Sequence, residues 1–174
     1  MTTLFGPAGI ELLLAMIIGI MTVYFTKMVL MNFYIKKTNE LNPYKNLSFM
    51  IFLSGTIFSV AYITFGIMQP LTATFKVLNT SGEVGFPYIL SCLQYTGMFL
   101  LLGYVFSGII TFIAYKLFAV MTTQLNEYEE IRDNNVGVAI LLVTLTIVTA
   151  MFAKEPFIVF LESLIPYPDV PSIM

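Results

Sequence analysis

Four long runs of apolar residues, separated by shorter polar stretches, dominate the pattern along the chain. The runs cover residues 10–34, 47–68, 88–115 and 136–152. A helix of about 20 apolar residues crosses the hydrocarbon core of a bilayer, and a helix satisfies its own backbone hydrogen bonds where lipid cannot. The pattern therefore predicts an all-α membrane protein with four transmembrane helices.

The composition agrees with this prediction and narrows the chemistry. Of the 174 residues, 58% are hydrophobic and only 10% are charged, whereas soluble domains carry about a quarter charged residues. The chain has no His and a single Cys, Cys92, so the usual zinc, haem, Ser-His and Cys-His sites lack their residues. A net charge of −2 without a basic run gives no electrostatic reason to bind nucleic acid. We expect no enzyme activity, no cofactor and no metal, and the lipid bilayer as the main partner.

The distribution of Lys and Arg predicts the orientation of the four spans. The two hairpin connections lie on one side of the membrane, and the termini and the middle connection lie on the other. The first side holds six basic residues: Lys27, Lys36, Lys37, Lys45, Lys116 and Arg132. The second side holds only Lys76 and Lys154. The positive-inside rule then places both hairpin connections in the cytoplasm and both termini outside.

The two halves of the chain match when the sequence is shifted by 89 residues. The matches include scarce residue types: Gly19 with Gly108, Lys27 with Lys116, Glu40 with Glu129, and Asn46 with Asn135. We interpret this as a tandem duplication of a helix–loop–helix unit within a single membrane domain over residues 1–174. Repeat one covers about residues 10–68, repeat two about 88–152, and a tail covers 153–174. Because each unit holds two spans, both should point the same way, as parallel repeats do.

The first and third runs are longer than a bilayer requires. We expect Lys27 and Lys116 at the cytoplasmic interface, with their ammonium groups reaching toward water. Residues 28–35 and 117–123 would then extend beyond the bilayer as apolar helix ends. Apolar surface outside the bilayer indicates a binding partner. The candidates are the extension of the other repeat, a neighbouring subunit and the membrane surface. The alternative is a strong tilt of both helices.

The junction before the fourth run reads EYEEIRDNNVGVAI over residues 127–140. An acidic stretch, an Asn and small residues at the start of an apolar helix resemble the YjfL-like family of bacterial inner-membrane proteins. The resemblance covers about residues 10–152 and implies a duplicated two-helix domain without an established reaction, in a bacterial inner membrane. The first unit departs from this motif, because Asn46 is kept but larger residues follow it.

The same junction has a physical interpretation of its own. Asn134 or Asn135 is expected to cap the fourth helix, and Glu129 and Glu130 favour the positive end of its dipole. The alternative is an acidic cytoplasmic patch that docks a basic partner or a divalent cation. The interface or docking candidates are Lys27, Lys116, Glu129, Glu130 and Asn135.

The spans hold no ionisable residue near a bilayer centre, which argues against a proton-coupled transporter. They do hold small and mildly polar residues, which are candidates for helix packing or for lining a pore: Gly19, Gly103, Ser107, Gly108 and Thr111. A pore would also use Gln94. Gln94 and Thr111, however, are separated by about 260° around a helix, which weakens that alternative.

Beyond the fourth run, Pro156 is expected to begin a short apolar helix over residues 157–165 on the outer membrane surface. Pro166, Pro168 and Pro171 should close the chain in extended form.

Two functions remain open at this point. The first is a self-associating structural or scaffold subunit, as a homo-oligomer or with other membrane proteins. The alternative is an oligomeric pore or channel for ions or small solutes.

Overall fold

The computed structural model describes residues 7–38, 43–80, 85–122 and 126–167, and this part of the chain is helical without any strand. The elements are α1 (Pro7–Thr38), the 3-10 turn η1 (Pro43–Lys45), α2 (Leu47–Phe65), α3 (Met68–Thr80), α4 (Phe86–Met121), α5 (Glu127–Arg132) and α6 (Val136–Glu162). The predicted all-α class is confirmed.

Four stretches are long and apolar enough to cross a membrane: Leu12–Thr38, Leu47–Thr80, Phe86–Met121 and Val136–Glu162. The predicted count of four is confirmed. The second stretch is longer than the apolar run that predicted it. α2 ends at Phe65, the chain turns at Gly66 and Ile67, and α3 continues to Thr80. The fold is that of a multi-pass membrane protein.

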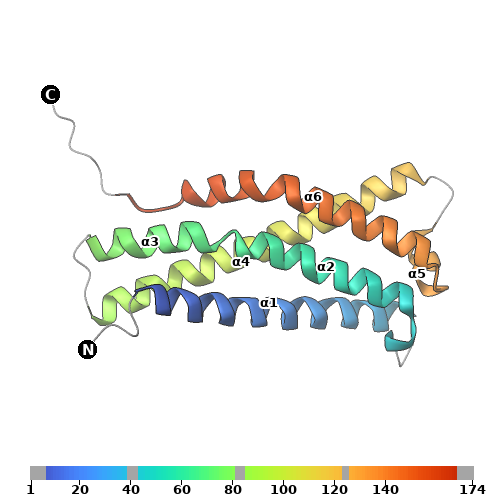
Figure 1. Cartoon of the computed structure of the whole chain (residues 1–174), viewed down its shortest axis with the longest axis horizontal. Helices are drawn as coiled ribbons and strands as arrows, with labels where there is room; N and C mark the ends of the chain where they lie inside the picture. Colours follow the sequence, from blue (N-terminus) through green and yellow to red (C-terminus); the bar gives the residue numbers. More distant parts are fainter. Residues whose placement is uncertain (1–6, 39–42, 81–84, 123–125, 168–174) are drawn as a thin grey trace.

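The helices run along one long axis (Figure 1). α1 and α4 run in one direction, and α2 with α3 and α6 run back. The end at which α1 and α4 finish and α2 and α6 begin, which includes η1 and α5, is called the hairpin end below. Both hairpin connections lie there, so the two halves face the same way. This arrangement agrees with the duplication inferred from the repeat, which itself stays a prediction.

α2 is the central helix of the bundle and packs against α1, α4 and α6. Two close contacts in the bundle depend on glycine, one at α2 and one at the turn that follows it. A Cβ at Gly55 would overlap the side chain of Val143 on α6, and a Cβ at Gly103 on α4 would overlap Ile67. α1 packs against the bundle along one narrow stripe. The buried residues among its described side chains are Ile18, Thr22, Thr26 and Tyr34.

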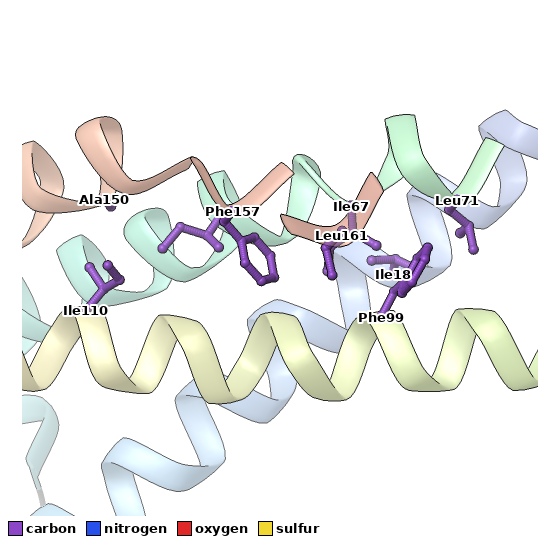
Figure 2. Packing of buried hydrophobic residues seen from close by; sticks show 9 residues of the cluster. Ile18, Ile67, Leu71, Phe99, Ile110, Ala150, Phe157 and Leu161 are labelled. Carbon is purple, nitrogen blue, oxygen red and sulfur yellow. The ribbon is translucent and has the colours of Figure 1, made fainter. Parts of the chain in front are cut away.

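α6 continues through Pro156 to Glu162, so the segment after the proline is helical but not separate from the fourth span. Figure 2 shows Phe157 and Leu161 pointing into the space between α6 and α4. Phe157 stacks on Phe106 with ring centroids 4.4 Å apart. This burial keeps the helix intact even though proline removes one backbone hydrogen bond. Of the expected extended prolines, Pro168 and Pro171 lie outside the described residues.

Candidate functional site at the hairpin end

Asn46 joins the two halves of the chain at the hairpin end. Its side chain is buried, with 7% exposure, and its Oδ1 caps α2 by accepting the N–H of Phe49 at 2.8 Å. Its Nδ2 donates to the carbonyl oxygens of Ile131 at 2.8 Å and Arg132 at 2.9 Å, which belong to the end of α5. A cap in the first half therefore also satisfies backbone acceptors in the second half.

Asn134 makes the reverse connection. It has a φ of 65°, the left-handed conformation that Asn tolerates better than most residues. Its N–H and that of Asn135 bond back to the carbonyls of Ile131 (3.2 Å) and Glu130 (2.8 Å), the pattern that closes a helix C-terminus. Its Oδ1 accepts the N–H of Ser48 at 3.0 Å. Asn134 thus caps α2 of the other half, and does not cap α6.

Asn135 is the residue that caps α6, one of the two alternatives that the sequence left open. Its Oδ1 accepts the N–H of Val138 at 3.3 Å, and its Nδ2 donates to Glu130 at 2.6 Å. The bond from Phe49 to Asn46 is the same bond 89 residues earlier. We call Asn46, Asn134 and their bonds between the halves the asparagine clasp.

An apolar cluster lies beneath the asparagine clasp. Tyr34 of α1 stacks on Phe49 with ring centroids 3.9 Å apart, and Phe118 of α4, Ile131 and Val138 belong to the same buried cluster. Tyr34 and Phe118 come from the two helix extensions beyond Lys27 and Lys116. Both extensions therefore contribute to one buried cluster at the starts of α2 and α6, which accounts for their length.

A cavity of about 400 Å³ opens beside this cluster. Residues 30–37 of α1 and 108–115 of α4 form two of its walls, and residues of α2, α5 and α6 complete the lining. Aromatic and aliphatic side chains form most of the lining, together with Thr111, Thr146 and Gly108. Among the described lining residues, Lys37 is the one cationic side chain. The Lys37 Nζ lies 3.8 Å from the ring centroid of Tyr128, a cation–π contact.

The predicted packing or pore-lining residues fall into two groups. Ser107 is buried and donates to the carbonyl of Gly103 at 2.7 Å, and Thr111 donates to that of Ser107 at 2.9 Å. Gly103 packs closely on Ile67. Gly19 and Gly108, in contrast, have no atom of another helix within 4 Å of where a Cβ would lie. Gly103 and Ser107 therefore pack inside the chain, and Gly19 and Gly108 border open space.

The predicted docking residues lie apart from one another. The Lys27 Nζ lies 5.6 Å from the ring of Tyr44 in η1, so it reaches toward the hairpin end. The Lys116 Nζ lies 5.6 Å from the ring of Phe112, one turn back along its own helix. Its ammonium group therefore points back along α4, the direction in which helix side chains lean. The position of both lysines at the membrane interface stays a prediction.

The acidic candidates form no described cation site. Glu129 is exposed, and Glu130 bonds to Asn135. Asp133 pairs with Arg132 at 3.1 Å, and this bond raises the pKa of Arg132. Among the described residues, no group of three or more acidic, Cys or His side chains is placed to hold a metal ion.

Two residues of the site were not singled out from the sequence for the roles they have here. Asn46 was noted as a repeat match, but its bonds to Ile131 and Arg132 bridge positions 85 and 86 residues away. Lys37 was counted as one of six basic residues on its side of the membrane, and nothing local pointed to its contact with Tyr128. Both roles depend on how the halves pack.

Comparison with known proteins gives one match. The family model described as Domain of Unknown Function (DUF350) matches residues 3–155. No curated protein and no solved structure shows significant similarity to the chain.

Proposed function

Since the chain belongs to the DUF350 family, whose description names no reaction, we propose that it acts as a self-associating structural subunit of a membrane assembly. The observation that carries this proposal is the open space at Gly19. Small residues on a lipid-exposed helix allow a second helix to approach closely. Gly19 faces such a space, whereas Gly55 and Gly103 are already occupied by neighbouring side chains.

The small number of buried side chains on α1 supports the same proposal. The side chains around Gly19 include Met16, Ile20 and Val23, which are exposed large hydrophobics. In a bilayer they face either lipid or another subunit. Next to Gly19, a groove of about 250 Å³ between α1 and α2 is lined by Ala15, Thr22 and Ala61 among others. Side chains of a second copy can enter a groove of this kind.

The rigidity of the hairpin end is the second support. Hydrogen bonds between the halves join the start of α2 to the junction of α5 and α6. The apolar cluster below them adds side chains of α1 and α4. Such contacts stabilise a fixed arrangement of the helices, which a structural subunit requires. We do not propose an enzyme, because the sequence lacks the residue sets of the common catalytic sites.

We further propose a location and an origin. The hairpin end carries Lys36, Lys37, Lys45 and Arg132, and the positive-inside rule favours the cytoplasm for it. With the resemblance noted above, this favours a bacterial inner membrane with both termini outside. The equivalent caps at Asn46 and Asn135 support descent of the two halves from one duplicated hairpin.

The oligomeric state tests the proposal. The full chain, in lipid nanodiscs or mild detergent, is examined by native mass spectrometry as wild type, Gly19→Leu and Gly97→Leu. Both glycines border open space, so neither substitution should unfold the chain. We expect a defined oligomer for the wild type and Gly97→Leu, and its loss in Gly19→Leu. A monomeric wild type, or an oligomer that Gly19→Leu leaves intact, would contradict the proposal, and equal loss in both variants would contradict the role of the Gly19 face.

An oligomeric pore is the second candidate. It would draw its polar lining from residues such as Ser107 and Thr111, because α4 carries most of the small polar side chains. Their hydroxyls already donate to carbonyls of their own helix, which speaks against this candidate. Liposome flux measurements separate the two: a selective current that a bulky substitution at Ser107 abolishes would favour the pore.

A further inference from the structure

The cavity at the hairpin end has the chemistry of a lipid site. Figure 1 shows α1 and α4 diverging toward that end, and the cavity of about 400 Å³ lies between residues 30–37 of α1 and 108–115 of α4. This volume falls within the ~300–1,000 Å³ of ordinary ligand pockets. The lining is apolar apart from a few groups, which favours a hydrocarbon occupant over a polar solute.

The cavity continues along the bundle. A second cavity of about 190 Å³ shares Leu30, Gly108 and Thr111 with the first and extends to Thr26 and Val60. From Thr26 to Lys37, α1 rises about 16 Å. The joined space is thus long and narrow, a shape that fits an acyl chain lying parallel to the helices.

Away from Lys37 and the tyrosine hydroxyls, this space offers water few partners. A buried water needs two to four polar partners, and apolar cavities stay dry. The two threonines of the larger cavity offer no free donor, because Thr111 donates to the carbonyl of Ser107 at 2.9 Å and Thr146 to that of Leu142 at 2.8 Å. In a membrane, the material available to fill the space is lipid.

Lys37 supplies a positive charge at the polar end of the cavity. Its ammonium group contacts the faces of Tyr128 at 3.8 Å and Phe33 at 5.8 Å. Among the described side chains, the ion pair of Arg132 with Asp133 is the only one within 4.0 Å, so no described carboxylate neutralises Lys37. The charge lies in the last turn of α1.

We propose that this cavity binds one anionic phospholipid of the surrounding bilayer, with an acyl chain between α1 and α4 and the headgroup phosphate at Lys37. Basic pockets between transmembrane helices recognise anionic headgroups in this way. Gly108 contributes to the site because it lines both cavities and has no side chain to fill the space between them. The bound lipid fills the space between α1 of the first half and α4 of the second half. The proposal does not depend on self-association.

Competition between two lipids tests the proposal. The full chain is purified from nanodiscs that hold equal amounts of phosphatidylglycerol and phosphatidylcholine with identical acyl chains, and retained lipid is counted by native mass spectrometry. We expect one retained phosphatidylglycerol per chain, preferred at least 5-fold over phosphatidylcholine on the basis of a charge contact worth ~1 kcal/mol.

Two pairs of variants separate the headgroup from the acyl chain. Lys37→Gln should reduce the preference to near 1 while some lipid of either kind is retained, and Lys76→Gln, at the other end of the molecule, should leave the preference unchanged. Gly108→Leu should fill the cavity and abolish retention of both lipids, and Gly97→Leu should retain them. Equal retention of the two lipids by the wild type would overturn the proposal, as would retention that Gly108→Leu does not reduce. The same spectra report the oligomeric state, so loss of the oligomer in Gly19→Leu with lipid retained distinguishes the two proposals.

Discussion

The backbone N–H of Ser48 donates to the side-chain Oδ1 of Asn134 at 3.0 Å, although the two residues are 86 positions apart and belong to different halves of the chain. The first N–H groups of a helix have no partner within the helix. At α2, one of them is satisfied by Asn46 and another by Asn134. The start of α2 therefore depends on the correct packing of the second half.

Replacing Asn134 should reveal two separate contributions. Asn134→Gly keeps the left-handed backbone conformation but loses the bond to Ser48, so the free energy of unfolding should fall by about 1 kcal/mol, a typical value for a cap. Asn134→Ala also forces alanine into that conformation, at an additional cost of about 1–2 kcal/mol. Reversible unfolding in mixed micelles measures both. Asn126→Ala is the control, because Asn126 precedes α5 without a side-chain cap bond. Equal stability of the Gly and Ala variants would contradict the strain argument.

Asn46 should contribute more to the free energy of unfolding than its counterpart Asn135. Asn46→Ser retains an oxygen that can cap α2 but removes the donor to the carbonyls of Ile131 and Arg132. The Ile131 carbonyl keeps the N–H of Asn134, but the Arg132 carbonyl loses this donor, and an unsatisfied acceptor away from water costs about 1–3 kcal/mol. Asn135→Ser removes only an exposed bond to Glu130, so its effect should be within about 0.5 kcal/mol. The same unfolding assay compares the two, and a larger loss in Asn135→Ser would show that the asparagine clasp contributes little.

The contact between α2 and α6 should tolerate no side chain at Gly55. A Cβ there would overlap Val143, and overpacking a fitted interface costs about 1–3 kcal/mol. Gly55→Ala should therefore destabilise the chain, and Val143→Ala in the same molecule should recover part of the loss. Gly97→Ala, at an open position of α4, should not lower the free energy of unfolding, because alanine favours a helix more than glycine does. Failure of Val143→Ala to recover any stability would mean that the two residues do not meet.

The apolar pattern predicted the four spanning helices because the requirements of a bilayer act on each helix separately. It placed the end of the second run at Met68, but α3 extends the helix to Thr80. Gln69, Thr72 and Lys76 break the apolar run in the sequence. The helix persists because Leu71, Thr74 and Leu78 are buried against neighbouring helices. Tertiary packing of this kind has no local signature.

The candidate site was predictable only in part for the same reason. Local cap rules led to Asn134 and Asn135 but could not decide between them, because the partner of Asn134 belongs to the other half. The helix extensions beyond Lys27 and Lys116 were predicted from their length. Their packing into one cluster with Phe49 and Val138 could be seen only in the structure. The segment after Pro156 was expected at the membrane surface, since nothing in its sequence shows that Phe157 would find Phe106.

The central claim of this account is that the two halves lie in the membrane facing the same way. In a background where Cys92 is replaced by Ala, single cysteines are placed at Tyr44 in η1, at Asp133 after α5, and at Lys76 in α3. All three positions are exposed. They are labelled with a membrane-impermeant maleimide in right-side-out and inverted vesicles. We predict that the cysteines at 44 and 133 react from one side, the cytoplasmic one, and that the cysteine at 76 reacts from the other. Labelling of positions 44 and 133 from opposite sides would contradict the account.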